Sequence, residues 1–439
     1  MEFSELGLNE TLLGAIVEAG YPNPTSVQEK AVPAALAGRD LMVSSQTGSG
    51  KTAAFMWPAL NRLMQESPLK ARGPRVLVLT PTRELAIQVT EACRKYGKGM
   101  RYAKAVSVVG GTSYIMQNKL LAQPYEVLVA TPGRLIDQMD SGRIDFGRLE
   151  MLVLDEADRM LDMGFIEDIE AIVDRLPKDR QTLLFSATFE PRVCRLAERL
   201  TRDAQRIEII ATAAQHEKIE QRLFFADGMG HKQRLLDHLL RGEDVEQAIV
   251  FTATKRDADQ IAETLGENGF LAAALHGDMH QGERNRTLGH LRRGALRVLV
   301  ATDVAARGID VAGISHVINF DLPKSAEDYV HRIGRTGRAG RSGIAVSLAS
   351  GDDVRRVKTI ERFIRHVIPV HTIVGLEPRV QPRTSAPRSA RPGSTPRPGG
   401  WGAKPSGAPR RNGPGAPRSE GGYRSGPSAG RGDRARRAD

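Results

Sequence analysis

Two series of short apolar runs, separated by stretches with helical periodicity, constrain the fold of this chain more than any other feature. The runs are rich in Val, Ile and Leu and are apolar throughout, which is typical of strands buried on both faces of a sheet. Stretches such as Arg83–Lys95 and Asp257–Asn268 show helical periodicity between the runs. The first series comprises Leu41–Val43, Val76–Leu79, Val106–Val109, Val127–Ala130, Met151–Leu154 and Leu183–Phe185, and the second comprises Ala248–Phe251, Leu271–Leu275, Val298–Ala301, His316–Phe320 and Ile344–Leu348. The alternation predicts an α/β protein with two tandem parallel sheets, each covered by helices on both faces.

The boundary between the two series falls in a small, polar segment. Ala211–Glu217 has no apolar stripe, so it is expected to be a linker. We therefore predict a first domain over residues 1–210, a linker over 211–217 and a second domain over 218–370. A chain of 439 residues is long enough for two or three domains.

The C-terminal stretch, residues 377–439, has a different composition. It contains 11 Pro and 12 Gly with few aliphatic residues, so it cannot bury enough apolar surface to offset the entropy of ordering. It also carries 14 Lys and Arg against 4 Asp and Glu, a net charge of +10, whereas the whole chain has +11. We predict a disordered, Arg-rich tail that attracts a polyanion, attached to a folded part that is nearly neutral.

Several classes of protein are excluded by what the sequence lacks. No apolar stretch approaches the roughly 18 residues of a membrane span. The N-terminal residues are acidic and do not resemble an export signal. Cys93 and Cys194 lie far apart and without metal-ligand spacing, so both are expected to be reduced thiols. We therefore predict a cytoplasmic protein with no membrane partner.

A glycine-rich segment between an apolar run and a helical stretch predicts a phosphate-binding loop. In parallel sheets, ligands bind beyond the carboxyl ends of the strands, which is where this segment lies. Glycines let main-chain amides turn toward phosphate oxygens, and a helix N-terminus adds a favourable dipole. Lys51 is expected to reach the β- and γ-phosphates of a nucleotide, and the Thr52 hydroxyl to bind Mg²⁺. The expected nucleotide contacts are Gln46, Thr47, Gly48, Ser49, Gly50, Lys51 and Thr52.

An acidic group follows another apolar run and supplies the partner that such a loop needs. Met151–Leu154 leads directly into Asp155 and Glu156. Asp155 is expected to hold Mg²⁺ through water, and Glu156 to orient and deprotonate an attacking water molecule. Acidic residues after a strand often only cap a helix, but their occurrence with the phosphate loop favours a site of nucleotide hydrolysis.

The segment Asp155-Glu156-Ala157-Asp158 resembles the motif that names the DEAD-box RNA helicases of superfamily 2. The resemblance covers nearly all of residues 1–370, with the motifs of the family in order, and implies two RecA-like domains. The family usually has Ala where this chain has Ser45, which keeps a small residue there. The opening Phe3–Leu8 and the Arg-rich tail are most similar to the bacterial RhlE type.

The resemblance extends to a segment ahead of the phosphate loop. Gly20–Gln28 is similar to the Q motif, with an isolated aromatic, Phe3, 17 residues before Gly20. It implies that Phe3, Tyr21 and Gln28 belong to the ATP site. A side-chain amide offers both a donor and an acceptor to an adenine edge, and an aromatic ring can stack on the base. The family resemblance thus implies a preference for ATP over GTP.

The remaining family motifs imply RNA contacts, coupling residues and arginine fingers. Contacts to phosphate and sugar position a strand without reading its bases. The implied RNA contacts are Pro81, Thr82, Arg83, Gly110, Gly111, Thr131, Pro132, Gly133, Arg134 and Thr302. Asp310 is implied to lie at the ATP ribose, and Arg335 and Arg338 at the γ-phosphate, as catalytic partners of Lys51, Asp155 and Glu156. The implied coupling residues between hydrolysis and strand separation are Ser186, Thr188, Asp158 and His331.

Together these features predict an ATP- and Mg²⁺-dependent RNA helicase that separates short duplexes. Single-stranded and short duplex RNA are the expected partners, in ribosomal or mRNA-decay complexes. Two alternatives remain open. One is an RNA-binding or annealing protein without productive unwinding, and the other is a superfamily 2 DNA translocase.

Overall fold

The computed structural model describes residues 2–45, 48–67, 71–209, 219–306, 311, 313–337 and 341–379. All of these residues belong to Met1–Thr384, the first of the two units into which the chain divides. The predicted linker, residues 211–217, lies outside the described residues, as does the predicted tail beyond Arg379. The description below therefore concerns the first unit.

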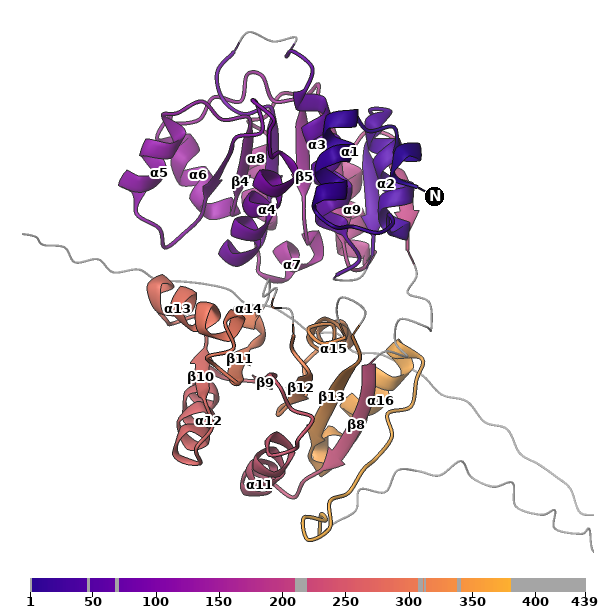
Figure 1. The fold of residues 1–439 in the computed structure, drawn as a ribbon, viewed down its shortest axis with the longest axis vertical. Coiled ribbons are helices and arrows are strands. Elements are labelled where there is room, and N and C mark those ends of the chain that lie inside the picture. The colour runs from indigo at the N-terminus through magenta and orange to yellow at the C-terminus, as the bar shows by residue number, and fades with distance from the viewer. Residues whose placement is uncertain are drawn as a thin grey trace, which may run out of the picture. The chain divides into compact units, whose positions relative to one another are not determined.

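The first unit contains two parallel sheets, one from each series of apolar runs (Figure 1). The first sheet has the strand order β3-β4-β2-β5-β6-β1-β7 and the second has the order β10-β11-β9-β12-β13-β8 in the described chain. The strands of the first sheet are β1 Leu41–Ser44, β2 Val76–Leu79, β3 Ala105–Val108, β4 Val127–Ala130, β5 Met151–Leu154, β6 Gln181–Ser186 and β7 Gln205–Glu208. Those of the second are β8 Ile219–Phe225, β9 Ala248–Thr252, β10 Ala272–Leu275, β11 Val298–Thr302, β12 His316–Asn319 and β13 Gly343–Ala349. The predicted fold class is confirmed.

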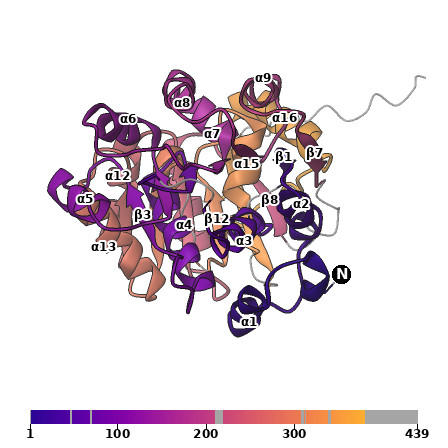
Figure 2. The same ribbon diagram turned by 90° about the horizontal axis from the view of Figure 1, so that it is seen from above.

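Helices cover both faces of the first sheet (Figure 2). They are the 3₁₀ helix η1 Phe3–Leu6 and the α-helices α1 Glu10–Glu18, α2 Ser26–Leu36, α3 Lys51–Leu63, α4 Arg83–Tyr96, α5 Tyr114–Leu121, α6 Pro132–Asp140, α7 Ala157–Asp162, α8 Ile166–Val173 and α9 Pro191–Leu200. Alternate residues of each strand point to opposite faces. In β5, Val153 packs with α1 to α4, whereas Leu152 packs with α6 to α9. Both faces are therefore apolar, as the uninterrupted runs predicted.

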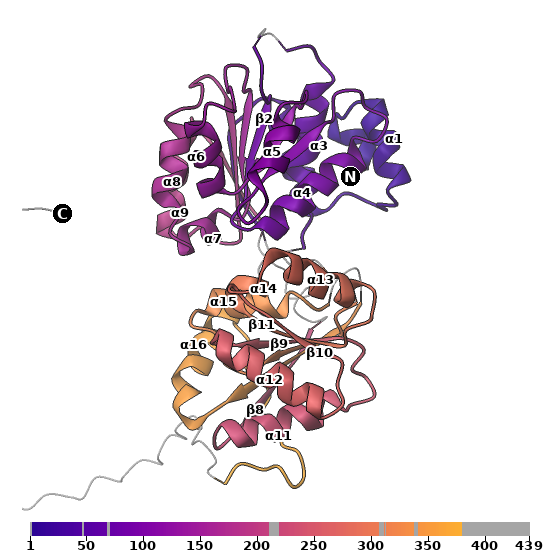
Figure 3. The same cartoon turned by 90° about the vertical axis from the view of Figure 1, so that its left-hand side faces the viewer.

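The second sheet is built in the same way (Figure 3). Its helices are α11 Met229–Leu240, α12 Lys255–Glu267, α13 Gln281–Arg292, α14 Asp303–Ala306, α15 Ala326–Ile333 and α16 Val354–Ile364, with the 3₁₀ helix η2 Gly351–Asp353. In β9, Val250 packs with α11 and α12, and Ile249 packs with α13 and α14 on the other face. Among the described residues, no helix is both long enough and apolar enough to cross a membrane.

The chain continues to pack on the second sheet beyond residue 370. Val370 forms a bridge with Leu223, and the Leu376 carbonyl lies 2.9 Å from His231 Nε2. The main-chain amide of Arg379 donates to Asp227 Oδ1 at 3.0 Å. The second domain therefore includes residues up to at least Arg379, further than the interval 218–370 that the sequence predicts.

The turns that follow the strands are fixed by helix caps. Thr82 caps α4 by accepting from the Leu85 amide, and Thr254 caps α12 by accepting from the Asp257 amide. Ser325 caps α15 in the same way through Asp328. Each cap satisfies an amide that the helix leaves unpaired, so the chain turns sharply at the carboxyl end of the sheet. Of the residues with predicted functions, Pro81, Thr82 and Arg83 lie at the first of these turns.

Candidate nucleotide and RNA site

The phosphate loop connects β1 to α3, as predicted. Gly48 and Gly50 have φ angles of +80° and +94°, in the left-handed region that glycine adopts readily. Lys51 is buried at the start of α3, and its Nζ donates to the Ser45 carbonyl at 2.5 Å. The Ser45 and Ser49 hydroxyls lie 2.9 Å apart, so the small side chain at Ser45 helps to close the loop. Gln46 and Thr47 lie outside the described residues.

The acidic group follows β5 and lies in a buried position beside Lys51. Burial, reinforced by the Glu156 carboxylate, raises the pKa of Asp155 to about 7. Burial also raises the pKa of Asp158 and lowers that of Lys51, while Asp155 and Glu156 oppose the shift of Lys51. Glu156 has a φ of +55°, which is uncommon for a residue with a side chain and marks local strain. The charges of Lys51 and Asp155 thus each affect the pKa of the other.

The acidic group has unused oxygen atoms that suit a cation. Asp155 Oδ1 and Asp158 Oδ1 are buried and have no hydrogen-bond partner among the described residues. No cluster of three or more His, Cys, Asp or Glu side chains in the described chain could hold a metal ion by itself. The residues therefore fit a Mg²⁺ ion whose remaining ligands come from phosphate and water.

Strand β6 lies between β1 and β5 and links their ends. The main-chain amide of Ala187 donates to Asp158 Oδ2 at 3.2 Å, and Ser44 Oγ donates to the Ala187 carbonyl at 3.0 Å. Ser186 is fully buried, and its Oγ accepts from the Thr188 amide at 3.3 Å. The turn after β6 thus contacts the acidic group through a main-chain amide.

The segment before the phosphate loop packs directly on it. Gln28 is buried; its Oε1 accepts from the Thr25 amide at 2.9 Å and its Nε2 donates to the Gly50 carbonyl at 3.3 Å. A Cβ at Gly50 would lie 2.4 Å from Gln28 Nε2, so Gly50 is needed for this contact. The Phe3 ring packs edge-on against Trp57, at 5.7 Å between centroids. Trp57 was not singled out in the sequence.

The first domain's predicted RNA contacts lie at the ends of β2, β3 and β4, which are neighbours. Pro81 and Thr82 are buried at the β2–α4 turn. The Arg83 guanidinium lies against the glycine pair that follows β3, and a Cβ at Gly111 would lie 2.1 Å from its Nη1. Gln117 holds the same loop, because its amide bonds the amide and carbonyl of Val109 at 3.0 and 3.2 Å. The sequence singled out the glycines but not Gln117.

Arg134 is held by a set of contacts that the sequence did not reveal. It lies in the first turn of α6, after the half-buried Gly133 and the buried Thr131 and Pro132. Its Nη1 donates to the Thr112 carbonyl at 2.8 Å, and its guanidinium lies 4.0 Å from the centroid of the Tyr114 ring. The Tyr114 hydroxyl donates to Asp137 Oδ2 at 2.7 Å. Cation–π and ionic contacts therefore orient a side chain that is predicted to bind RNA.

In the second domain, Thr302 ends β11 and is followed by Asp303, which forms a partly buried ion pair with Arg332. Arg332 Nε and Nη2 donate to the two carboxylate oxygens of Asp303 at 2.6 and 2.7 Å. Arg332 Nη1 also donates to the Asp321 carbonyl at 2.6 Å. Arg332 therefore fixes α15 against the ends of β11 and β12. Arg332 lies in the sequence segment His331–Arg338, which contains the predicted arginine fingers, but the sequence analysis assigned it no role.

The predicted finger Arg335 lies in the turn after α15 and is buried. Arg335 lines a small pocket with His331 and Arg332, and Arg159 of α7 contributes to the same pocket. The arginine-rich turn is thus near the helix that begins with the acidic box. Arg338 and Asp310 lie outside the described residues.

A buried ion pair joins α4 to α13. Arg284 Nε and Nη2 donate to Glu84 Oε1 at 3.0 and 2.7 Å, and both side chains are buried. Arg83 Nη1 donates to Gln281 Oε1 at 2.9 Å in the adjoining turn. The N-terminus of α4, in the first domain, is therefore bonded to α13, in the second domain. Residues 200 positions apart make this pair, which no local pattern predicts.

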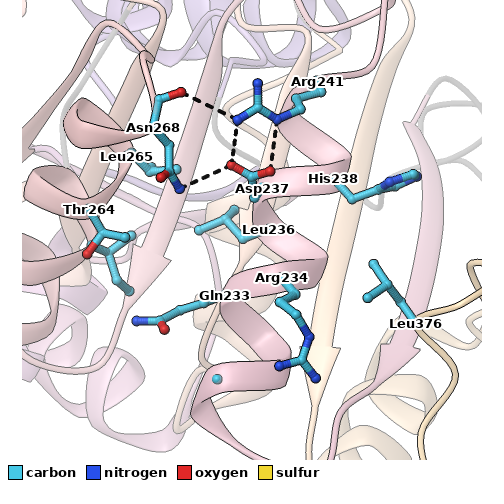
Figure 4. Close-up of a pocket in the computed structure, with 12 residues that line it drawn as sticks. Gln233, Arg234, Leu236, Asp237, His238, Arg241, Thr264, Leu265, Asn268 and Leu376 are labelled. Atoms are coloured by element: carbon cyan, nitrogen blue, oxygen red, sulfur yellow. Dashed lines mark hydrogen bonds and ion pairs between the residues drawn. The ribbon is translucent and has the colours of Figure 1, made fainter.

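A groove between α11 and α12 has a different character (Figure 4). Its volume is 550 Å³, and its lining contains none of the residues predicted for the nucleotide or RNA site. Asp237 Oδ2 accepts from Arg241 Nε at 2.8 Å, and Asp237 Oδ1 accepts from Asn268 Nδ2 at 3.2 Å. These polar groups satisfy one another along the groove.

Comparisons with known proteins agree with this arrangement. The family model for DEAD/DEAH box helicases matches residues 25–196, and that for the helicase conserved C-terminal domain matches residues 231–340. The chain is 45% identical over 367 residues to the ATP-dependent RNA helicase DeaD of Klebsiella pneumoniae, covering 84% of this chain and 56% of DeaD. It is 42% identical over 382 residues to the ATP-dependent RNA helicase SrmB of Haemophilus influenzae, covering 87% of each chain.

Solved structures with the same fold contain RNA and nucleotide analogues. S. cerevisiae Dbp5 bound to RNA and ADP BeF3 has a TM-score of 0.76 and 32% identity, over 85% of this chain and 95% of that chain. Mss116p bound to ssRNA and AMP-PNP has a TM-score of 0.77 and 27% identity, over 85% of this chain and 80% of that chain.

Proposed function

Because the chain belongs to the DEAD-box family of ATP-dependent RNA helicases, we propose that it couples RNA-stimulated ATP hydrolysis to the local separation of short RNA duplexes. The observation that carries the proposal is the order of strand ends in the first sheet. The ends of β5, β6 and β1 are neighbours and carry the nucleotide groups. The ends of β3, β4 and β2 are neighbours and carry the predicted RNA contacts. One edge of one sheet thus offers two adjacent sites.

The chemistry proposed for the nucleotide half is hydrolysis of the γ-phosphoryl group by water. Lys51 neutralises phosphate charge, and Thr52 and Asp155 would hold Mg²⁺, the latter through water. Glu156 orients the attacking water and takes its proton. Arg335 and Arg338 stabilise the charge that spreads over the phosphoryl oxygens; arginines in that role are worth roughly 10³–10⁵ in rate. The Mg²⁺ ion would supply charge neutralisation across the phosphates.

The role proposed for the second domain is to complete the site when ATP and RNA are bound. Lys51 and Glu156 belong to the first domain, whereas Arg335 and Arg338 belong to the second. A ligand favours the closed state only by binding it more tightly than the open state. ATP would contact both of these sets, and RNA would contact Arg83 and Arg134 of the first domain and Thr302 of the second. Each ligand therefore favours closure, and hydrolysis releases the strand.

The RNA half offers groups that suit phosphate and ribose rather than bases. Main-chain amides near Gly110, the Thr131 hydroxyl and the Arg134 guanidinium are of this kind, so we expect little sequence preference. Ribosomal RNA and mRNA in decay complexes are equally acceptable substrates on this basis. We propose that the protein acts in the cytoplasm and is of the RhlE type.

Phosphate release tests the proposal when it is measured without nucleic acid, with single-stranded RNA and with the matching DNA. RNA should stimulate turnover at least tenfold more than DNA, and a short RNA duplex should be separated only with ATP. The Glu156→Gln variant should lose turnover but keep ATP-dependent RNA binding, because Gln cannot accept the proton of water. Equal stimulation by DNA would favour a DNA translocase. ATP-independent annealing without turnover would favour a passive RNA-binding protein.

A further inference from the structure

Four aromatic side chains from separate segments form one cluster on the first domain. They are Phe3 of η1, Tyr21 of the loop after α1, Trp57 of α3 and Tyr96 of α4. The ring centroids of Trp57 lie 5.7 Å from Phe3, 6.2 Å from Tyr21 and 5.8 Å from Tyr96, all in edge-on contacts. Trp57 is fully buried, so the other rings pack around a fixed centre. Edge-on aromatic pairs are favourable beyond the area they bury, so the contacts stabilise this arrangement of rings.

A single hydrogen bond closes this cluster. The hydroxyl oxygens of Tyr21 and Tyr96 lie 2.9 Å apart, and their ring centroids lie 6.1 Å apart. Tyr96 is buried, whereas Tyr21 is half-buried. Burial and the bond to Tyr21 raise the pKa of the Tyr96 hydroxyl well above its usual range. The bond therefore joins a protected, neutral hydroxyl to one nearer the surface.

The two tyrosines that form this hydrogen bond belong to segments with different predicted ligands. Tyr21 lies in the segment predicted to bind ATP, and Tyr96 lies in the helix that carries a predicted RNA contact. Tyr21 precedes Gln28, whose amide bonds the carbonyl of Gly50 in the phosphate loop. Tyr96 is the last residue of α4, which begins at Arg83. Arg83 in turn lies against Gly111 and bonds Gln281. Helix α4 thus runs from the RNA half of the sheet edge to the segment expected to hold adenine.

We propose that Tyr96 is a positioning residue for ATP: its hydroxyl fixes the Tyr21 ring for adenine and links the adenine contact to the helix that carries Arg83. The inference rests on the proposed function, because it takes Tyr21 as an ATP contact and Arg83 as an RNA contact. A loop residue held by a buried partner loses less conformational freedom when it binds a ligand, which increases affinity. A rigid helix shared by two sites makes the binding of one ligand depend on the other, and the dependence is reciprocal.

The alternative is that the cluster only stabilises the fold. A purely structural hydroxyl would change the melting temperature without changing the apparent affinity for ATP. It would also leave the effect of RNA on ATP affinity unchanged. The two roles therefore differ in measurements made on folded protein.

The experiment compares Tyr96→Phe, Tyr21→Phe and the double variant, all of which keep the rings and remove hydroxyls. Steady-state hydrolysis with saturating RNA should show a KM for ATP raised about three- to tenfold in each, as expected for the loss of one neutral hydrogen bond. The kcat should stay within twofold, because no group at the γ-phosphate changes. The double variant should be no worse than either single variant, because both remove the same bond.

A matched control is Tyr125→Phe, which removes the hydroxyl of another buried tyrosine from the opposite face of the same sheet. Its KM for ATP should equal that of the wild type. Binding of a fluorescent ATP analogue, with and without RNA, then tests the link to α4. The gain in ATP affinity caused by RNA should be at least threefold smaller in Tyr96→Phe than in the wild type.

Three results would overturn the inference. They are an unchanged KM in Tyr96→Phe, additive effects in the double variant, or a raised KM with the full RNA-induced gain retained. The wild-type protein is the check on the underlying function. If the wild type shows RNA-stimulated hydrolysis and Tyr96→Phe has the same KM for ATP, only the role of Tyr96 is rejected. A wild type without RNA-stimulated hydrolysis would reject the proposed function itself.

Discussion

At the scale of single residues, the predicted nucleotide site is a cluster of charged side chains whose burial is unfavourable. Asp155 has an oxygen without a hydrogen-bond partner among the described residues, beside the left-handed Glu156 and the buried Lys51. Charges that lose water must be paired or neutralised, so this arrangement is costly in the ligand-free protein. The proposed ligands, phosphate and Mg²⁺, would reduce that cost.

Asp155→Asn should therefore stabilise the ligand-free protein. The folded pKa of Asp155 is about 7, against 3.8 for the ordinary group. A raised carboxyl pKa means that the destabilisation is fully present above pH 7 and disappears as the pH falls toward 3.8. The upper bound is about 4 kcal/mol, at 1.36 kcal/mol per pKa unit. The melting temperature in EDTA should exceed that of wild type at pH 8, with a smaller difference at pH 5.

The matched control for this change is Asp179→Asn, in which the exchanged carboxylate is fully exposed. Its melting temperature should follow that of the wild type at both pH values. If Asp155→Asn melts lower than wild type at pH 8, or if the difference grows toward pH 5, the carboxylate is not under the strain described. Loss of ATP hydrolysis is expected in this variant in either case.

The chemical roles of residues at strand ends could be predicted from the sequence, whereas contacts between residues far apart in the chain could not. Lys51, Asp155 and the glycines follow apolar runs in a pattern that phosphate binding requires. Trp57 gives no such signal, because a buried tryptophan in a helix is indistinguishable from ordinary core. Arg332 stands within an arginine-rich segment, but its partner Asp303 is 29 residues away. Only the folded chain brings such pairs together.

At the scale of elements, the described strands were predicted wherever both faces are buried. The runs at β2, β4 and β5 have the predicted bounds. Two edge strands were missed, β7 and β8. β7 has only one buried residue, Ile207, so its sequence Gln-Arg-Ile-Glu lacks an apolar run. In β8, three polar residues follow Ile219, and among the described strands β8 pairs with β13 alone. Edge strands need less apolar surface, and their periodicity is correspondingly weak.

The contact between Arg83 and the glycine pair predicts the effect of a single methyl group. In Gly111→Ala, the new Cβ would meet Arg83 Nη1 at 2.1 Å, and the φ of +70° would be strained. Arg83 must then leave its position, so affinity for single-stranded RNA with a non-hydrolysable ATP analogue should fall at least tenfold. ATP binding should stay within twofold, because the nucleotide groups lie at other strand ends. Fluorescence anisotropy with labelled RNA measures the first quantity.

Gly142→Ala separates the two causes of this effect. Gly142 has a φ of +64° but open space around its Cβ position. It therefore carries the backbone strain without the clash. RNA affinity should be unchanged in this control. If both variants lose RNA affinity equally, backbone strain rather than the position of Arg83 is responsible.

At the scale of the whole molecule, charge and chemistry are separated along the chain. Residues 385–439 carry 12 Lys and Arg against 3 Asp and Glu, a net charge of +9. The chain up to Arg379 packs on the second domain, and the described residues all belong to the unit bounded by Met1 and Thr384. Every group assigned to ATP lies before residue 340. A chain that ends at Thr384 should therefore keep the site complete and lose most of the excess positive charge.

Truncation after Thr384 should weaken RNA capture while sparing the chemistry. Each phosphate neutralised on a single strand contributes about −0.7 to the slope of log affinity against log salt. If half of the lost charges engage RNA, the slope should flatten by roughly 3 units, with kcat at saturating RNA within a few-fold of full length.

A full-length variant with Ser in place of every Lys and Arg in 385–439 separates charge from length and should match the truncation. Parallel salt lines for the full-length and truncated proteins would mean that the tail does not bind RNA electrostatically. Trp401 and Tyr423 are too sparse to stack on successive bases, so the loss should be equal for RNAs of different sequence.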